Sequence, residues 1–161
     1  MAPARRERPA GYGLWAGLAL ATALGVMGAC AEGPQNILRD GYYTAEAAEF
    51  DSQGWKEFLT IYVCDGRIAS AQYNSRNLKG FLRSWDMADK RRSALTTGTN
   101  QSKYGRAYTV ALLNRQDPAQ VTPIPGAAQA HPRFQRLAEA AITKARKGDQ
   151  RVAFVSFEER R

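Results

Sequence analysis

Histidine and cysteine are scarce in this chain, and their scarcity argues against several kinds of site. The 161 residues contain one histidine, His131, and two cysteines, Cys30 and Cys64. A soft-metal site needs several imidazole or thiolate ligands, so we expect no metal site. The two cysteines also limit disulfide formation to a single possible bond.

The sequence also lacks the motifs of nucleic-acid-binding proteins and of hydrolases. Its formal net charge is +8, but the basic residues are mostly dispersed. The densest run, Lys90 to Arg92, belongs to no RNP, zinc-finger or helix-turn-helix pattern. No serine or cysteine forms a nucleophile motif beside His131, which directly precedes Pro132. We therefore expect no nucleic-acid partner and no catalytic residue, and we favour a protein that is not an enzyme.

Long hydrophobic runs are absent as well. The longest, from Leu14 to Ala29, has 16 residues, which is short for a helix that spans a membrane. Hydrophobic residues make up 44% of the chain and charged residues 24%, close to the average of globular proteins. The length and composition therefore predict one packed domain behind a short apolar segment.

The amino-terminal residues have the order of an export signal. Three arginines precede the apolar run, and small residues follow it in Met27-Gly28-Ala29-Cys30. These four residues resemble a bacterial lipobox, in which a peptidase cuts before a cysteine that carries a diacylglyceride. An ordinary cleaved signal and an uncleaved anchor helix are the alternatives.

The lipobox resemblance divides the chain and predicts its location. We expect a lipoprotein signal peptide over residues 1–29, lipidation at Cys30 and a tether over residues 30–39. Buried acyl chains contribute about 0.8 kcal/mol per CH₂, so several chains on Cys30 would hold the protein on membrane lipid. The expected location is the cell envelope, on the extracytoplasmic side, either periplasmic or at the outer membrane. Lipidation would leave Cys64 as the one free thiol, without a disulfide partner.

Alternating patterns predict strands over residues 41–50 and 151–157 and a β-hairpin over residues 57–73. Tyr43, Ala45 and Ala47 share one face of the first strand, and Asp65-Gly66 suits a tight turn between the two hairpin strands. The second strand, which ends at Cys64, is apolar on both faces. We expect the Cys64 thiol to be a half-buried side chain.

Helical periods predict three helices after the hairpin. The first runs from Ser84 to Gly98 with Trp85, Ala88 and Leu95 facing inward, and the second spans residues 103–115. The third starts at Pro132, ends before Gly148 and has the strongest apolar face, made of Phe134, Leu137, Ala138, Ala141, Ile142 and Ala145. The sequence therefore predicts an α+β domain with a mainly antiparallel sheet, one β-hairpin and about three helices.

Several short motifs, taken in order, resemble the FMN-binding domain family. They are Asp40-Gly41-Tyr42-Tyr43, Phe50-Asp51, the segment 54–58, the hairpin turn 65–68, Gln116-Asp117-Pro118, and the turn and helix of residues 126–148. The closest resemblance is to exported lipoproteins of that family that are linked to extracellular electron transfer. It covers residues 40–157 and leaves residues 158–161 as a tail.

The resemblance implies a flavin site at the turn before the last helix. In the family this turn reads Asp-x-x-Ser-Gly-Ala-Thr, and the threonine forms a phosphoester bond with FMN. Here Thr122 replaces the aspartate, Pro125 replaces the serine, Gly126 and Ala127 agree, and Ala128 stands at the acceptor position. Because an alanine methyl group cannot form a phosphoester, covalent flavin attachment is excluded at this turn.

Two functions remain open for this domain. In the first, the turn still binds FMN or a similar planar anion without a covalent bond, and the protein exchanges electrons with a redox partner. The aromatic residues that could stack on the flavin are Tyr42, Tyr43, Trp55, Trp85 and Tyr104. In the second, the protein is a non-enzymatic envelope lipoprotein that has lost flavin and serves in binding or assembly. The small residues 126–128 are then only a tight connection to a helix, and the aromatic residues belong to the core.

Overall fold

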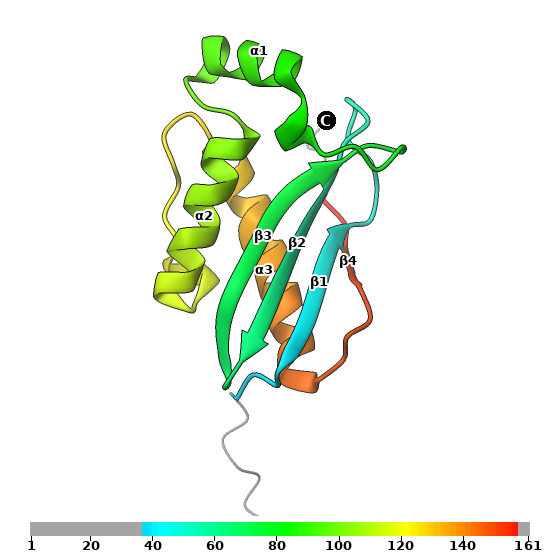
Figure 1. Ribbon diagram of the computed structural model, residues 1–161, viewed down its shortest axis with the longest axis vertical. Helices are drawn as coiled ribbons and strands as arrows, with labels where there is room; N and C mark the ends of the chain where they lie inside the picture. Colours follow the sequence, from blue (N-terminus) through cyan, green and yellow to red (C-terminus); the bar gives the residue numbers. More distant parts are fainter. Residues whose placement is uncertain (1–36, 158–161) are drawn as a thin grey trace, which may run out of the picture. The chain divides into compact units, whose positions relative to one another are not determined.

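The computed structural model describes residues 37–157, which form one α+β unit (Figure 1). The signal peptide, Cys30 and nearly all of the predicted tether lie outside the described residues, as does the tail. The described elements are, in chain order, β1 (Gly41–Ala47), β2 (Lys56–Cys64), β3 (Arg67–Arg76), the 3₁₀ turn η1 (Arg83–Trp85), α1 (Met87–Thr97), α2 (Gln101–Arg115), the 3₁₀ turn η2 (Pro118–Gln120), α3 (Ala130–Lys147) and β4 (Ala153–Val155).

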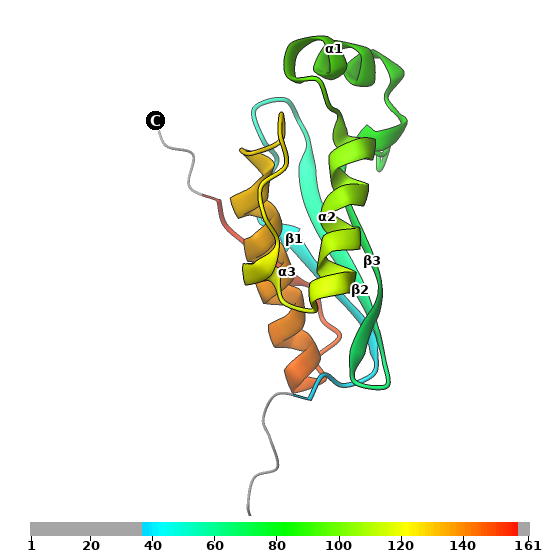
Figure 2. The same cartoon turned by 90° about the vertical axis from the view of Figure 1, so that its left-hand side faces the viewer.

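The sheet has the strand order β3-β2-β1-β4, and helices α2 and α3 pack on one of its faces (Figure 2). β1 and β3 both pair antiparallel with β2. Asp65 and Gly66 turn the hairpin with φ of 51° and 69°, the left-handed values that two-residue hairpin turns require. The predicted fold class and the predicted hairpin are therefore confirmed.

β4 is shorter than the predicted strand and pairs with β1 in parallel. Ala45 lies opposite Ala153 and Ala47 opposite Val155. A parallel connection needs a long crossover, and here the chain from β1 reaches β4 only after the hairpin and all three helices. The sheet is thus mainly, but not wholly, antiparallel.

α3 provides the main apolar face of the core. All six residues predicted for that face are buried, and Gly148 caps the helix with φ of 67° by donating its N–H to the Ala145 carbonyl. The face packs on the inward side chains of β1 and β2, among them Tyr43, Leu59 and Ile61. The helix begins at Ala130, two residues before the predicted start at Pro132.

α2 packs on β3 through Tyr108 and Leu112, as its period predicts. It begins two residues earlier than predicted, at Gln101, because the Asn100 side chain caps it by accepting the Lys103 N–H. Gly105 is needed for this packing, since a Cβ atom there would lie 2.9 Å from the Tyr73 carbonyl oxygen.

The predicted inward face of the first helix is wrong. Trp85 lies in η1 and is 64% exposed, Leu95 is 88% exposed, and Ala88 is also exposed. The buried residue of α1 is charged: Asp89 accepts two hydrogen bonds from the Arg83 guanidinium, at 2.9 and 3.1 Å. α1 is therefore held by polar contacts at its start rather than by an apolar face. No helix within residues 37–157 has the length and apolarity needed to cross a bilayer.

Candidate functional site

The turn between η2 and α3 contains the residues predicted to contact a flavin. Gly126 has φ of 76°, and a Cβ atom there would lie 2.1 Å from the carbonyl oxygen of Thr97, the last residue of α1. Ala127 is buried, and its carbonyl accepts a hydrogen bond of 2.9 Å from the Tyr108 hydroxyl. The turn is small because it packs against the end of α1 and against α2.

The five residues predicted to contact a flavin differ in position and in solvent exposure. Gly126, Ala127 and Ala128 follow one another in the turn, with the Ala128 methyl group exposed. Thr122 and Pro125 are also exposed and precede the turn on the segment that connects it to η2. Of these five residues, Ala127 is therefore the one in the core.

The first turn of α3 leaves few amide donors for an anion. The N–H groups of Ala130 and His131 donate to the carbonyls of Ala127 and Ala128, and Pro132 has no N–H. The His131 ring forms a hydrogen bond with the Val121 carbonyl. His131 lies inside α3 and is not its capping residue. Because these donors are occupied and Ala128 has no hydroxyl, the turn does not fit covalently attached FMN.

A layer of aromatic side chains lies behind the turn. Tyr108 stacks on Phe134 with ring centroids 5.0 Å apart, and both rings contact Tyr73 edge-on. The Tyr73 hydroxyl donates to the Glu57 carboxylate at 2.9 Å, and the second Glu57 oxygen lies 3.1 Å from the Nε atom of Arg133. These residues join the sheet, α2 and α3 in one buried cluster.

The tyrosines of this layer remain protonated at neutral pH. Burial raises the pKa of Tyr73 well above its usual value, and the nearby Glu57 charge raises it further. Burial likewise raises the pKa values of Tyr104 and Tyr108. Their hydroxyls serve as hydrogen-bond donors and do not suit the role of a general base, which needs a pKa near the working pH.

The aromatic residues predicted to stack on a flavin do not gather at one place. Tyr43 is in the core, and Tyr104 is in the layer behind the turn. Tyr42 lies on the opposite face of the sheet, stacked on Tyr62 with centroids 4.6 Å apart. Trp55 is covered by the Arg83 guanidinium, whereas Trp85 is exposed.

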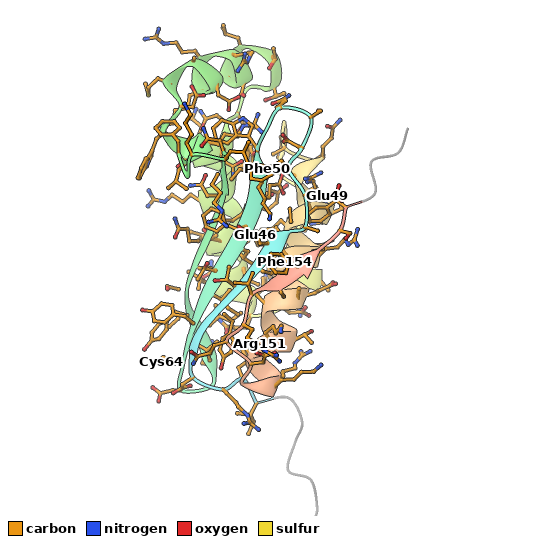
Figure 3. All side chains as sticks on the ribbon, turned by 90° about the vertical axis from the view of Figure 1, so that its right-hand side faces the viewer. Glu46, Glu49, Phe50, Cys64, Arg151 and Phe154 are labelled. Carbon is orange, nitrogen blue, oxygen red and sulfur yellow. The ribbon has the colours of Figure 1, made fainter. Side chains whose placement is uncertain are left out.

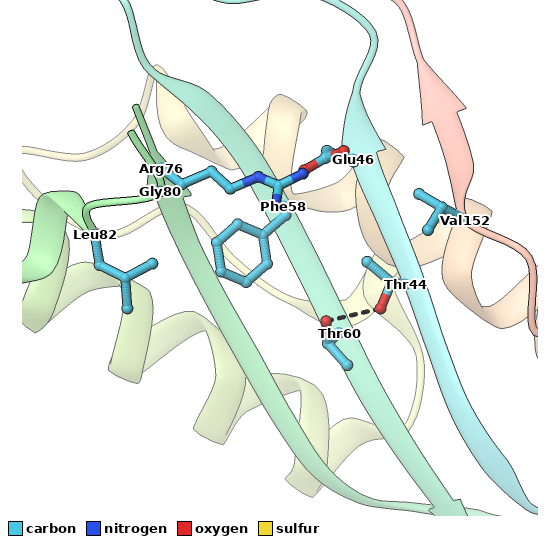
Figure 4. Close-up of a pocket in the computed structure, with 8 residues that line it drawn as sticks. All are labelled: Thr44, Glu46, Phe58, Thr60, Arg76, Gly80, Leu82 and Val152. Carbon is cyan, nitrogen blue, oxygen red and sulfur yellow. Dashed lines mark hydrogen bonds and ion pairs between the residues drawn. The ribbon is translucent and has the colours of Figure 1, made fainter. Parts of the chain in front are cut away.

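The face of the sheet that the helices leave uncovered has a hollow of about 350 Å³ (Figure 4). Its lining comes from three strands, the segment after β3 and the residue before β4: Thr44, Glu46, Phe58, Thr60, Arg76, Gly80, Leu82 and Val152. Figure 3 shows Glu46 and Phe154 on neighbouring strands of this region. None of the sequence-based predictions includes this hollow, although the alternation of β1 and the doubly apolar β2 could have indicated it.

A buried carboxylate lies at the edge of this hollow. Glu46 is 6% exposed and pairs with Arg76 at 2.5 Å and with Lys56 at 3.7 Å. The hydroxyls of Thr44 and Thr60 are hydrogen-bonded to each other at 2.9 Å. Because the carboxylate is neutralised by two cations, the hollow suits binding better than proton transfer.

Cys64 is half-buried, as predicted, and its thiol lies among carboxylates. The Cys64, Asp40 and Asp65 side chains offer ligand atoms within 4.8 Å of one another at the hairpin turn. One Asp40 oxygen already accepts the Gly66 N–H at 3.1 Å. The predicted thiol is thus located near the surface beside two acidic groups.

Comparison with known proteins identifies relatives of the whole domain. No model of a known protein family matches the chain. A 15 kDa lipoprotein of Treponema pallidum is 29% identical over 125 residues, which are 78% of this chain and 86% of that protein. The relatives' names mention no flavin, so the FMN-binding resemblance stays a prediction.

A solved structure also matches the fold. The crystal structure of the CPE2226 protein from Clostridium perfringens has a TM-score of 0.72 and 30% sequence identity, over 75% of this chain and 99% of that chain. The match to the T. pallidum protein supports a lipoprotein. At this identity and coverage, the chain belongs to the same protein family as the CPE2226 protein.

Proposed function

We propose that this chain is a lipid-anchored protein of the cell envelope whose domain binds a ligand or partner outside the cytoplasm and catalyses no reaction. One observation supports the anchor above all: a lipoprotein is 29% identical over most of the chain. Cys30 in its lipobox-like context stands seven residues before Ile37, where the described part of the chain begins. An acylated Cys30 would therefore hold the domain close to a bilayer.

The described residues support a binding role rather than catalysis. The buried carboxylates Glu46, Glu57 and Asp89 each lie beside a cation, and the buried tyrosines have raised pKa values. The carboxylates are engaged in ion pairs, and the tyrosine hydroxyls stay protonated at neutral pH, so these groups hold the structure together. The hollow on the uncovered sheet face is lined by three large apolar side chains and four polar or charged ones, a mixture that suits a small ligand.

Non-covalent flavin binding is the second candidate function. The left-handed Gly126 and the exposed Ala128 favour it, because they keep a small turn at the start of α3. Flavin would supply the electron transfer, and the turn would hold its phosphate. The occupied amides of Ala130 and His131 make a weak phosphate site the most that this turn offers.

Lipidation is tested by labelling cells with an alkyne-bearing fatty acid and measuring the intact mass of the protein extracted from membranes. We expect label in the wild type and in Cys64→Ser, which serves as the matched thiol control, and none in Cys30→Ser. Label that persists in Cys30→Ser, or its absence from the wild type, would refute the proposed anchor.

Flavin binding is tested by the absorption spectrum of gently purified protein, with and without added FMN. A colourless protein that does not bind FMN supports the binding role without electron transfer. A flavin band that is released on denaturation supports the second candidate. Ala128→Thr restores a hydroxyl at the acceptor position, and covalent FMN in that variant would show that the turn keeps the geometry of the family.

A further inference from the structure

One end of the domain carries five exposed basic side chains, which we call the basic end: Arg39, Arg67, Arg115, Arg146 and Lys147. They come from the segment before β1, the β2–β3 hairpin and the last residues of α2 and α3. Among residues 37–157, none of the five takes part in an ion pair. In Figure 1 the hairpin turn and the carboxyl end of α3 lie at the same end of the sheet, away from α1.

Three of these side chains surround a second hollow. Arg67, Arg115 and Arg146 line a space of about 430 Å³ together with Leu38, Gly66, Asn114, Gln116 and Ile142. No acidic residue contributes to this lining. An anionic group in this hollow would therefore have three arginine side chains in its lining, although the Asp40 carboxylate lies close by and accepts the Gly66 N–H at 3.1 Å.

Specific contacts fix the elements that carry the basic end. The Gln116 side chain accepts the Ile68 N–H at 2.8 Å and donates to the Ile68 carbonyl at 3.0 Å, which holds the hairpin against the end of α2. The Arg39 N–H donates to the Ala145 carbonyl at 3.0 Å, which holds the segment before β1 against α3. The arginines on either side of these contacts are thus presented on a rigid surface.

The helix dipole explains only part of the positive charge at the basic end. Basic residues in the last turn interact favourably with the helix dipole, which accounts for Arg115, Arg146 and Lys147. Arg67 lies on a hairpin and Arg39 precedes a strand, so the dipole does not account for them. Three carboxylates lie near this end: Asp40 and Asp65 beside the hairpin turn, and Asp149 after α3, which is paired with Lys144 and Arg151. The five cations outnumber them.

The described chain begins at this same end. Leu38 lines the hollow, and an extended chain spans about 3.3–3.6 Å per residue, so Leu38 lies within about 28 Å of Cys30. An anchor at Cys30 would thus bring the basic end, before any other part of the domain, to the lipid headgroups. We propose that the basic end docks on the anionic phospholipid headgroups of the membrane that holds Cys30, an inference that rests on the proposed lipid anchor.

Vesicle co-sedimentation tests this docking without the anchor. The unit Gly33–Arg161 is compact by itself, and 75% of this chain suffices to match 99% of the CPE2226 chain in its crystal structure. We expect residues 33–161 to bind vesicles of phosphatidylglycerol and phosphatidylcholine, to bind pure phosphatidylcholine weakly, and to dissociate as salt rises. Equal binding to the two vesicles would overturn the proposal.

A pair of charge-matched variants locates the surface. The first removes Arg67, Arg115 and Arg146 as Arg→Gln, and the second removes Arg91, Lys103 and Arg106, exposed residues of α1 and α2, as Arg→Gln or Lys→Gln. A basic residue near an anionic bilayer contributes about 1 kcal/mol, which is about five-fold in binding, so the first variant should lose on the order of 100-fold. An equal loss in the second variant would show that only net charge matters and would overturn the docking surface.

Further controls separate this inference from the anchor itself. The Arg→Lys triple variant at positions 67, 115 and 146 keeps the charge and should retain vesicle binding, and circular dichroism should show every variant folded. Competition by millimolar inorganic phosphate would indicate a free-anion site and overturn docking on lipid. Fatty-acid label on Cys30 with no vesicle binding refutes only the docking, whereas vesicle binding without label refutes only the anchor.

Discussion

Helices α1 and α3 are held to the same domain by opposite means. α3 buries a continuous apolar face on the sheet, with Phe134, Leu137 and Ala141 fully buried. α1 exposes its large apolar side chains and buries the carboxylate of Asp89 against Arg83. The hydrophobic effect is non-directional and tolerates small shifts, whereas an ion pair depends on one geometry. We therefore expect α3 to unfold only with the whole domain and α1 to open by itself.

The largest loss of stability should come from removing a buried side chain between α3 and the rest of the core. Phe134→Ala removes a fully buried ring that contacts Tyr73 and Tyr108, so we expect a loss of about 3–5 kcal/mol in the free energy of unfolding. Leu95→Ala on α1 is the matched control and should change it by less than about 0.5 kcal/mol, because Leu95 is exposed. Urea unfolding measures both. Similar losses in the two variants would abolish the contrast between the helices.

The second-largest effect should be a loss of stability that is confined to α1. Asp89→Asn leaves Arg83 without its anionic partner, and we expect a loss of about 2–3 kcal/mol in the stability of this helix. Hydrogen exchange should accelerate in α1 and remain unchanged in α3. Arg92→Gln is the control, because Arg92 is mostly exposed and contacts Asp89 at 3.4 Å, and its effect should stay within about 1 kcal/mol. Faster exchange throughout the domain after Asp89→Asn would contradict independent opening.

A third change tests the contact between the end of α1 and the turn that precedes α3. Gly126→Ala places a Cβ atom against the Thr97 carbonyl and forces an alanine into a left-handed conformation, which costs about 1–2 kcal/mol before the clash is counted. Gly54→Ala is the control, since Gly54 has φ of 79° and no atom within 4 Å of the added Cβ. Thermal unfolding should show the larger loss at Gly126, and equal losses would mean that the turn does not press on α1.

The smallest effect should appear on acidification. Hydrogen bonds from Arg83 hold the pKa of Asp89 below its usual value, so the ionised form is favoured in the folded state. This stabilisation is complete above the unfolded pKa of about 4 and is lost as pH falls through the lower folded value. NMR shifts of the α1 amides should move further in that range in the wild type than in Asp89→Asn. The change should be smaller than that of the substitution, because a neutral carboxyl still accepts hydrogen bonds.

The sequence was sufficient to predict an element where a single local pattern determines that element. The apolar period of α3, the alternation of β1 and the Asp65-Gly66 turn each gave the observed element. The period of Trp85, Ala88 and Leu95 predicted an inward face for α1, but in the described part of the chain all three side chains are exposed rather than covered by a packing partner. Such partners arise from tertiary structure and leave no local signal in the helix.

The candidate sites were less predictable for the same reason. The hollow beside Glu46 joins residues from β1, β2, β3 and the two segments after β3 and before β4, and the basic end joins segments from Arg39 to Lys147. Residues 126–128 do lie in a turn before α3, yet the hydrogen bonds of the Ala130 and His131 amides depend on a helix start that lies two residues earlier than predicted.

The parallel pairing of β4 with β1 gives the domain two distinct poles. Because both strands run in the same direction, residue 157 leaves the sheet at the end opposite to that where residue 37 approaches it (Figure 1). Under the proposed lipid anchor, a fluorescent reporter fused directly after Phe157 would start from the pole remote from the bilayer. Its distance from the headgroups would then distinguish a domain that stands upright on its tether from one that lies flat.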